Sequence, residues 1–215
     1  MTAGKGPEVS PVSLFRLATE ELVDAELWDA ITDKNVADWE AEWRPEIDRL
    51  LKALNKQGIE RQFWPQSRDW DWRAKIKAIE GRLGNPSFAI VCEGMTQAMM
   101  ITDLTKRARI ESQKNDHLVF VVFLEAAPWN RRELVGPPPR FSGTGSLLIL
   151  AAIELSKAEG YKGRIGLHSL PQANDFYANK VGMTDLGPDP AYRNILRYFE
   201  MTPEQAEVFI TKGKT

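Results

Sequence analysis

A run of seven apolar residues, Leu118–Leu124, is the sequence feature that most constrains the fold. Such a run predicts a central β-strand that is covered on both faces. An apolar helix, Ser146 to about Glu159, and a further strand, Gly163–Ser169, come after it along the chain. A strand, a helix and a second strand in this order indicate a crossover connection within one sheet. The chain is therefore predicted to be an α/β protein.

Other segments add antiparallel strands to this unit. Phe88–Glu93 and Met99–Leu104 are predicted to be two strands, joined by a turn over Glu93–Thr96. A short helix is expected at about Pro171–Asn179, and Asn194–Met201 is expected to be the final strand. A crossover within an otherwise antiparallel run predicts a mixed sheet with helices on both faces.

The first third of the chain has a different pattern of apolar residues. Leu14–Ala18 alternates and predicts a first strand, whereas about Glu20 to Gly81 is helical in pattern and holds six of the seven tryptophans. A second helix is predicted over Trp72–Ile79. One buried helical stripe is indicated by apolar residues at i, i+3, i+4 and i+7, namely Ile47, Leu50, Leu51 and Leu54.

Composition and charge argue against several classes of protein. A formal net charge of −2 argues against a nucleic-acid-binding protein, which needs a basic face. The single Cys92 excludes an intramolecular disulfide, and it is interpreted as a small core residue on a strand. With two histidines in the chain, a histidine-based metal cluster is not expected.

No membrane segment is predicted either. The longest apolar runs, Leu118–Leu124 and Leu147–Ile153, are far below the roughly 20 residues that span a bilayer. The first residues have no apolar core of the kind that a signal peptide needs. We therefore expect a cytoplasmic protein with no membrane partner.

The segment Arg140-Phe-Ser-Gly-Thr-Gly-Ser146 carries the clearest chemical signal. Glycines at this spacing let consecutive backbone N–H groups turn toward one point. The apolar helix that follows adds its unpaired N-terminal donors, and Arg140 can add a bidentate charged contact. Together these groups predict a phosphate-binding loop that needs no metal. The alternative is a flexible glycine and serine loop capped by Ser146. The segment has no Lys for a P-loop, and Leu148 stands where a dinucleotide fingerprint has its third glycine.

The loop and its surroundings resemble the GCN5-related N-acetyltransferase superfamily. The family's pyrophosphate loop has the pattern Arg/Gln-x-x-Gly-x-Gly/Ala, which Arg140, Gly143 and Gly145 match. As in the family, the loop lies between a central strand and a long apolar helix. Ala173–Tyr177 and then Val181–Met183 resemble the next landmarks of the family.

The resemblance covers about residues 86–201 well and the N-terminal part loosely. It implies one domain over residues 1–215, in which 1–85 is a strand plus a Trp-rich helical region on the acceptor side. Residues 86–201 would be the acyl-CoA-binding core. The implied fold is a mixed, mostly antiparallel sheet with helices on both faces and a helical N-terminal elaboration.

The resemblance also implies acetyl-CoA as co-substrate, with no metal. The family often has an Asn seven residues before its Tyr, where this chain has Leu170, so Asn174 is the substitute that we consider. The residues that the resemblance assigns to coenzyme A are Leu124, Ala126, Arg140, Phe141, Ser142, Gly143, Thr144, Gly145, Ser146 and Asn174.

Family members transfer the acetyl group by direct attack of an amine, with no acyl-enzyme. Tyr177 would protonate the leaving thiolate or hydrogen-bond to it, and the alternative is an amphipathic helix residue with its hydroxyl at the surface. Glu125, at the end of the apolar strand, is one candidate for the general base, and the alternative is a strand-end charge that reaches water. His168 is the other candidate, and the alternative there is a structural histidine. A water chain could also serve in place of both.

The acceptor side is the least defined part of the prediction. Trp64, Trp70, Trp72 and Trp129 are candidates to contact a cationic amine, and the alternative is that they belong to the core. The insertion from Trp129 to Pro139 could form a stiff rim of the site. The acceptor is expected to be a small-molecule or peptide amine, with a homodimer left open. A non-catalytic acyl-CoA-binding module of the same fold is the alternative function.

Overall fold

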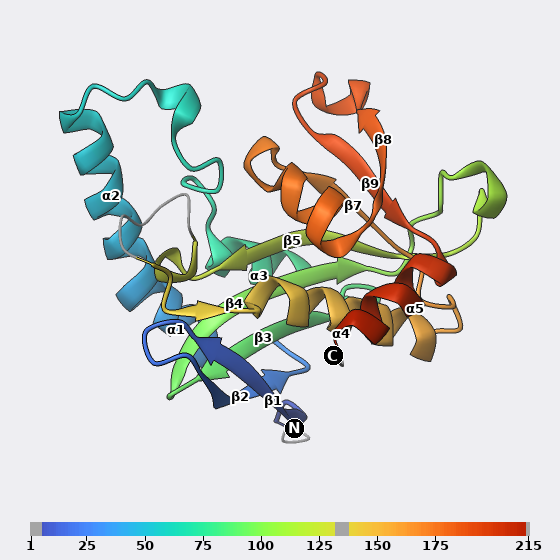
Figure 1. Ribbon diagram of the computed structural model, residues 1–215, viewed down its shortest axis with the longest axis horizontal. Helices are drawn as coiled ribbons and strands as arrows, with labels where there is room; N and C mark the ends of the chain where they lie inside the picture. The colour runs from blue at the N-terminus through green and yellow to red at the C-terminus, as the bar shows by residue number, and fades with distance from the viewer. Residues whose placement is uncertain (1–5, 132–137, 214–215) are drawn as a thin grey trace. The chain divides into compact units, whose positions relative to one another are not determined.

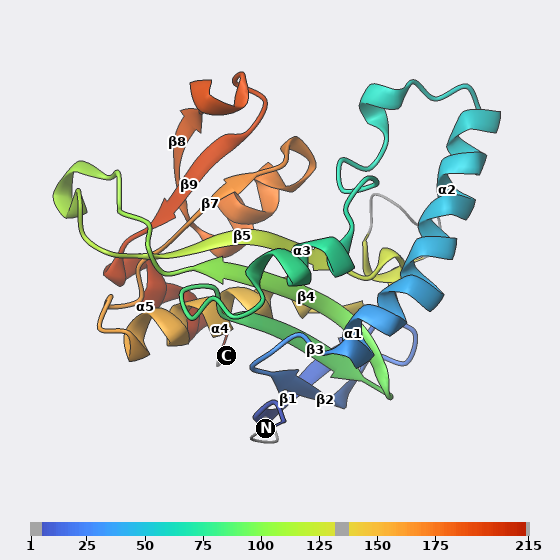
Figure 2. The same cartoon turned by 180° about the vertical axis from the view of Figure 1, so that it is seen from behind.

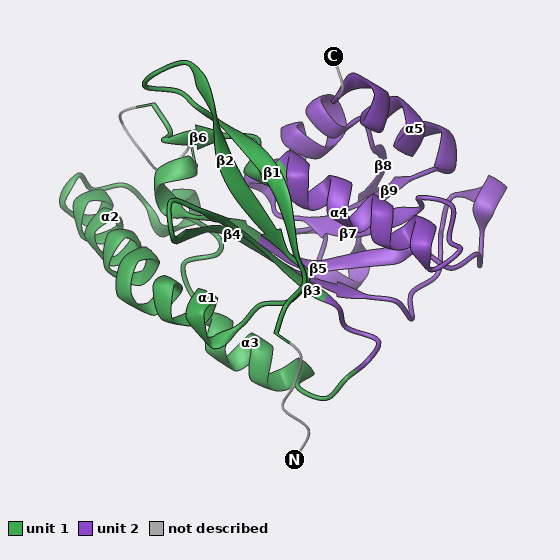
Figure 3. Ribbon diagram, turned by 90° about the horizontal axis from the view of Figure 1, so that it is seen from below, with its two compact units in different colours: residues 1–82, 87–99, 125–145 green, residues 83–86, 100–124, 146–215 purple. Residues whose placement is uncertain are grey.

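The structure is a computed structural model that describes residues 6–131 and 138–213. The chain forms two compact units that interleave along the sequence (Figure 3). The first unit comprises Met1–Arg82, Ser87–Met99 and Glu125–Gly145, and the second comprises Leu83–Pro86, Met100–Leu124 and Ser146–Thr215. That residues 1–215 form a single domain stays a prediction.

The first unit begins with a hairpin of β1 (Val9–Arg16) and β2 (Glu21–Trp28), which are antiparallel along their whole length (Figure 1). β6 (Phe141–Ser142) pairs with the other edge of β1, and β3 (Ser87–Cys92) pairs with β2. β4 (Met95–Asp103) follows β3 along the chain. These pairings give the strand order β6-β1-β2-β3.

The strand β2 corrects the prediction that about Glu20 to Gly81 is helical. Its residues alternate, with Ala25 buried and Asp24 and Glu26 exposed, which is the period-two pattern of a half-covered strand. Glu20, at a φ of 54°, completes the tight turn that joins β2 to β1. The high content of acidic residues in this segment concealed a strand that has one solvated face.

Between β2 and β3 the first unit has five helical segments, of which the three α-helices are labelled in Figure 2. They are α1 (Asp33–Asp38), the π-helix η1 (Trp39–Trp43), α2 (Arg44–Lys56), the 3-10 turn η2 (Arg61–Phe63) and α3 (Trp72–Ile79). α3 has the predicted bounds. In α2 only Ile47 of the predicted stripe is buried, and Leu50, Leu51 and Leu54 are half-buried.

The second unit has its strands in the order β5-β7-β9-β8. Their bounds are Val119–Ala126, Ile165–Ser169, Arg197–Met201 and Thr184–Pro188. β5 and β7 are parallel, and the other two pairings are antiparallel. The result is a mixed, mostly antiparallel sheet flanked by helices, which confirms the predicted fold class.

Two long helices belong largely to the second unit, α4 (Thr144–Ala158) and α5 (Pro203–Lys212), and they lie side by side (Figure 1). An ion pair of 2.6 Å between Lys157 and Glu207 joins them. Their apolar sides pack on the strands with Leu148, Ile149, Ile153 and Ala206, all fully buried. The shorter helical turns are η3 (Glu111–Gln113), η4 (Pro128–Asn130), η5 (Pro171–Ala173), η6 (Phe176–Val181) and η7 (Pro190–Tyr192).

Several predicted boundaries are wrong. The expected helix at 171–179 is a 3-10 turn followed by the π-helix η6. The turn between β3 and β4 is only Glu93–Gly94. The last strand starts at Arg197 rather than Asn194, because Arg193 and Asn194 both have a left-handed φ, which a strand cannot contain. The sequence analysis did not predict α5.

Candidate active site

The parallel strands β5 and β7 are paired over a short stretch only. Their register ends at Val121 and Leu167, whereas β5 continues to Ala126 and β7 to Ser169. From this point the two strands no longer share a hydrogen-bond ladder. The backbone of β5 beyond Val121 is therefore able to accept partners other than β7.

The exposure of the side chains in the apolar run increases where the pairing with β7 ends. Leu118, Val119 and Val121 are at most 3% exposed, whereas Val122 is 37% exposed and Leu124 is half-buried. The prediction of a strand covered on both faces is thus correct for the first half of the run and wrong for the second. A strand that loses its neighbour also loses part of its cover, and here the apolar side chain of Val122 is exposed.

The glycine-containing loop is shorter than the sequence indicated. Phe141 and Ser142 form β6, and α4 begins at Thr144, so Ser146 lies inside the first turn and is not the cap. Gly143 has a φ of 98°, a conformation that favours glycine. The first N–H groups of α4 have no acceptor within the helix, so they form a donor cluster at the positive end of the helix dipole.

The backbone before the glycines is anchored on both sides. Arg140 N–H donates to the carbonyl of Trp129 at 3.0 Å, and the carbonyl of Arg140 accepts from Leu17 N–H at 3.1 Å. Phe141 N–H donates to the side chain of Asn130 at 3.0 Å. The guanidinium of Arg140 lies 4.9 Å from the centre of the Trp129 ring and is exposed. The loop is thus fixed, while the Arg140 charge remains accessible to an anion.

Glu125 lies at the end of β5 and is buried with 4% exposure. One carboxylate oxygen accepts the indole N–H of Trp72 at 2.6 Å, and the other lies 3.3 Å from the Arg131 guanidinium. Ser67 also hydrogen-bonds the carboxylate, and it accepts from Arg131 at 2.8 Å. Burial raises the pKa of Glu125, and Arg131, Ser67 and Trp72 oppose that increase.

His168 belongs to a second group of charged residues, on β7. Its Nε2 lies 2.7 Å from a carboxylate oxygen of Asp189, and the same oxygen accepts from Arg109 at 2.6 Å. The imidazole packs against the rings of Tyr192 and Tyr198, with centroid distances of 4.3 and 5.1 Å. The Arg109 and His168 hydrogen bonds hold the pKa of Asp189 well below its usual range.

Tyr177 and Asn174 lie in and next to η6. Tyr177 is 7% exposed, and its ring centre lies 6.0 Å from that of Phe199. Burial raises the pKa of the Tyr177 phenol, so the hydroxyl keeps its proton at neutral pH. The side-chain oxygen of Asn174 is buried and has no hydrogen-bond partner among residues 6–131 and 138–213. A buried polar atom without a protein partner is expected to hydrogen-bond water or a bound molecule.

Several solved structures have a fold similar to that of this chain. The acetyltransferase PaiA from Thermoplasma acidophilum, solved with coenzyme A, aligns with a TM-score of 0.51 at 11% identity, over 83% of this chain and 98% of its own. A yellow fever mosquito protein assigned to the arylalkylamine N-acetyltransferases gives a TM-score of 0.52 at 16% identity, over 94% and 97% of the two chains. No protein-family model matches the sequence, and neither does any curated protein.

A protein from Desulfovibrio desulfuricans assigned to the GNAT family of acetyltransferases also has a TM-score of 0.52, at 8% identity, over 83% of this chain and 99% of its own. The chain has the GCN5-related N-acetyltransferase fold. These identities are low, so the likeness concerns the fold. The acetyltransferase fold accounts for the order of β5, the glycine loop, α4 and β7 that the sequence analysis expected.

Within the acetyltransferase fold, the tryptophans predicted to contact an acceptor differ in exposure. Trp72 is fully buried and Trp129 is 9% exposed, and their indole N–H groups donate to Glu125 and Gln97. Trp64 and Trp70 are half-buried. Cations of the chain already lie over both, Arg61 at 5.6 Å and Lys75 at 4.9 Å. Both of the more exposed rings thus already pair with a cation of this chain, and their contact with an acceptor stays a prediction.

Several residues around the predicted catalytic side chains were not assigned to the site from the sequence. They include Ser67 and Arg131 beside Glu125, Asp189 beside His168, and Arg109, which bonds Asp189. Asp189 had one local signal, because it precedes a proline and caps the turn η7 through Ala191 N–H at 2.9 Å. The predicted rim at 129–139 lies mostly outside the described residues, which omit 132–137.

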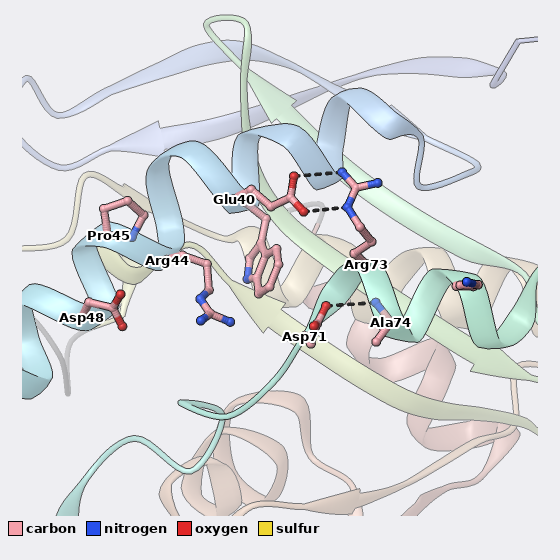
Figure 4. A pocket seen from close by; sticks show the side chains of 9 residues that line it. Glu40, Arg44, Pro45, Asp48, Asp71, Arg73 and Ala74 are labelled. Atoms are coloured by element: carbon pink, nitrogen blue, oxygen red, sulfur yellow. Dashed lines mark hydrogen bonds and ion pairs between the residues drawn. The ribbon is translucent and has the colours of Figure 1, made fainter.

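A groove of about 580 Å³ lies on the first unit between η1, the start of α2 and α3 (Figure 4). Its charged residues mostly contact groups of the groove itself. Arg73 makes two bonds to Glu40, of 2.6 and 2.8 Å, and Arg44 lies 5.2 Å from the Trp39 ring centre. Asp71 accepts Ala74 N–H as the cap of α3. Of these contacts, the Arg73–Glu40 pair joins α3 to η1, and α3 carries Trp72, which donates to Glu125.

Among the described residues, no group of three or more His, Cys, Asp or Glu side chains could hold a metal ion. In the same residues, no helix has the length and apolar character to cross a membrane.

Proposed function

We propose that this chain is an acetyl-CoA-dependent N-acetyltransferase that transfers the acetyl group to an amine of a small molecule or peptide by direct attack. The observation that carries the proposal is the early end of the β5–β7 ladder. Backbone groups released from a ladder need other hydrogen-bond partners. The amides of a pantetheine arm supply them, and the exposed side chain of Val122 adds apolar contact.

The diphosphate of the coenzyme would bind at the start of α4. Unpaired N–H groups and the positive end of a helix dipole favour an anion there. The left-handed φ of Gly143 lets the backbone turn at this point, and the exposed Arg140 guanidinium adds a positive charge. Phe141, Ser142 and Asn174 stay proposed contacts of the coenzyme.

The chemistry requires a neutral amine, because an alkyl ammonium keeps its proton at pH 7. Glu125 or His168 removes that proton. The amine nitrogen then attacks the thioester carbonyl carbon, the C–N bond forms, the C–S bond breaks, and coenzyme A leaves as a thiolate. Backbone N–H groups at Leu124 and Ala126 would polarise the carbonyl oxygen.

Tyr177 would protonate the leaving thiolate or donate a hydrogen bond to it. Burial raises the pKa of its phenol, so the hydroxyl keeps its proton at neutral pH and can donate a hydrogen bond. The acceptor amine is proposed to contact Trp64 and Trp70, whose rings already carry cations of the chain. Trp72 and Trp129 would support these contacts from the interior.

The test combines a binding and a turnover measurement. Isothermal titration with acetyl-CoA is paired with a thiol-release assay over a panel of small amines and peptides. We expect Tyr177→Phe to lower kcat by at least about 100-fold while the Kd for acetyl-CoA changes little. Tyr161→Phe is the matched control, because Tyr161 stacks on His117 and lies outside the proposed site.

Two outcomes would contradict the proposal. If the protein does not bind acetyl-CoA, the assignment of the loop and of the parted strands is wrong. If it binds acetyl-CoA but acetylates none of the amines and peptides, the second candidate is favoured, a non-catalytic acyl-CoA-binding module. The second candidate is supported by the contacts of Glu125. Both of its carboxylate oxygens already have a partner, Trp72 and Arg131, which leaves the carboxylate less able to accept a proton from an amine.

A further inference from the structure

We propose that Asp189 is a positioning residue that holds His168 in the Nε2–H tautomer, so that Nδ1 of His168 is the proton acceptor for the incoming ammonium. This inference rests on the proposed acetyl transfer and selects one of its two candidate bases. All of the residues that carry it belong to the second unit.

A buried carboxylate anchors Arg109. Glu200, on β9, is fully buried and accepts the backbone N–H groups of Arg109 and Ile110, at 2.7 and 3.0 Å. It also accepts from the side chains of Gln113 and Tyr198, at 2.7 and 3.0 Å. Four donors satisfy this carboxylate. Glu200 thereby fixes the segment that carries Arg109 against β9.

Gly166 makes this arrangement possible. A Cβ at position 166 would lie 2.8 Å from the Tyr198 hydroxyl and 3.2 Å from Leu118. Any larger residue would displace the Tyr198 ring, which stands between Glu200 and the imidazole of His168. The packing of Tyr198 against Glu200 and His168 therefore requires a glycine at position 166.

Asp189 is held in its ionised form by two hydrogen-bond donors. One of its carboxylate oxygens accepts from Arg109 at 2.6 Å and the other accepts Ala191 N–H at 2.9 Å. A carboxylate held by a guanidinium and a backbone N–H stays ionised. An ionised carboxylate only accepts hydrogen bonds, so the proton in the 2.7 Å contact with His168 lies on Nε2.

Nδ1, the other ring nitrogen of His168, is free of a proton in this tautomer. When Nε2 carries the proton of a neutral imidazole, Nδ1 has a lone pair and no proton. Nδ1 of His168 is buried and has no hydrogen-bond partner in the part of the chain that the structure describes. His117 also has such an Nδ1, but its ring stacks on Tyr161 and no carboxylate fixes its tautomer. The carboxylate is what distinguishes His168.

Access to Nδ1 is the remaining requirement. The Tyr192 ring lies 4.3 Å from the imidazole, and Tyr192 is itself 46% exposed on the loop between β8 and β9. Asp189 starts this loop and also binds Leu196 and Asn194 through its backbone. Tyr192 thus lies between the imidazole and the exposed side of this loop, and in the proposal it is the side chain that an incoming amine displaces. Asp189 keeps both the loop and the imidazole in place.

The proton transfer is balanced without any further reactant. The ammonium gives one proton to Nδ1, which leaves a neutral amine and an imidazolium. The Asp189 carboxylate stabilises that imidazolium through Nε2–H. After the C–N bond forms, the attacking nitrogen loses one of its two remaining protons, and when the C–S bond breaks that proton neutralises the thiolate of coenzyme A. The imidazolium then releases its proton to water. The charged or titratable groups that face the imidazole directly or through Tyr198 are Asp189, Arg109, Tyr192, Tyr198 and Glu200.

The tautomer is tested by ¹⁵N NMR of the histidine side chains, at a pH where the rings are neutral. The chain has two histidines, so His117→Gln leaves the His168 signals alone in the spectrum. We expect a pyrrole-type Nε2 and a pyridine-type Nδ1 for His168. In Asp189→Asn the amide can donate to Nε2, and the population of the Nδ1–H tautomer should rise. A proton on Nδ1 of the otherwise unchanged protein would overturn the inference.

Kinetics supply the second readout. We expect Asp189→Asn to lower kcat/KM about 100-fold, by analogy with the usual contribution of a positioned base, and to alter the fall of kcat/KM on the acid side. Asp185→Asn is the matched control, because Asp185 forms an exposed 2.8 Å ion pair with Arg197 on the same hairpin. It should change neither quantity by more than about twofold.

The two proposals fail in different ways. Equal kinetics for Asp189→Asn and Asp185→Asn, in a protein that acetylates amines, would overturn the role of Asp189 and leave the acetyl transfer intact. Absence of acetyl transfer by the unchanged protein would overturn both the transfer and the proton-acceptor role. Circular dichroism of each variant, compared with the unchanged protein, shows whether a lost rate reflects a lost fold.

Discussion

Replacement of Gly143 by Asp tests the glycine loop most directly. Gly143 has a φ of 98°, so any side chain there carries backbone strain of about 1–3 kcal/mol. There is room for the side chain itself, because the nearest atom to an added Cβ is a methyl carbon of Leu14 at 3.9 Å. We therefore expect Gly143→Asp to fold with reduced stability rather than to lose its structure.

The effect on coenzyme binding has a separate cause. A carboxylate at about 6 Å from one diphosphate charge, at an effective dielectric constant of about 20, is repelled by about 3 kcal/mol. Salt screening reduces this, and the second phosphate charge increases it. We therefore expect acetyl-CoA to bind weaker by about 2–4 kcal/mol, which corresponds to roughly a 30- to 1,000-fold higher Kd.

Two controls separate charge from strain. Gly143→Asn has nearly the same shape and strain without the charge, and Asn tolerates a positive φ better than most residues. Gly94→Asp places the same residue at a φ of 72°, in the turn between β3 and β4, where nothing lies within 4 Å of an added Cβ. Isothermal titration at low and high salt gives the Kd of each variant. The same Kd for Gly143→Asp and Gly143→Asn would refute the reasoning.

The remaining predictions concern buried groups. Trp72→Phe removes the 2.6 Å bond to Glu125 from a fully buried site, and urea unfolding should show a loss of about 3 kcal/mol; Trp64→Phe, at a half-buried site, should cost clearly less. Because the pKa of Asp189 is held below its ordinary value, its contribution to stability is present above about pH 4 and is lost as the pH falls. The difference in unfolding free energy between the unchanged protein and Asp189→Asn should therefore shrink between about pH 5 and pH 2, and a constant difference would contradict the ion pair. Burial raises the pKa of the Cys92 thiol, so an aromatic disulfide reagent should label it only as the protein unfolds, and fast labelling of the native protein would contradict its placement.

Local signals were sufficient for a large part of the fold. α3 has the predicted bounds because its cap, Asp71, accepts Ala74 N–H, which is a contact between neighbours in sequence. Cys92 is a buried strand residue, as predicted. The crossover from β5 through α4 to β7 followed from runs of apolar residues, since a strand and a helix that are apolar throughout need cover from other elements.

Tertiary contacts decided what local signals did not contain. β2 depends on its pairing with β1 and β3, and its acidic residues are compatible with a strand only because one face is solvated. Phe141–Ser142, predicted to be loop, is a strand because β1 pairs with it from more than a hundred positions away. Nothing in the sequence of the apolar run 118–124 indicates where its pairing with β7 ends.

The same division applies to the candidate catalytic residues. The sequence alone singled out Glu125 and His168 as titratable groups in apolar strands, and it determined the glycine pattern that precedes α4. Only the tertiary structure brought Trp72 and Ser67 to Glu125, and Asp189 and Arg109 to His168. The physical reason is that the proton affinity and tautomer of a buried group depend on neighbours that folding supplies from distant parts of the chain.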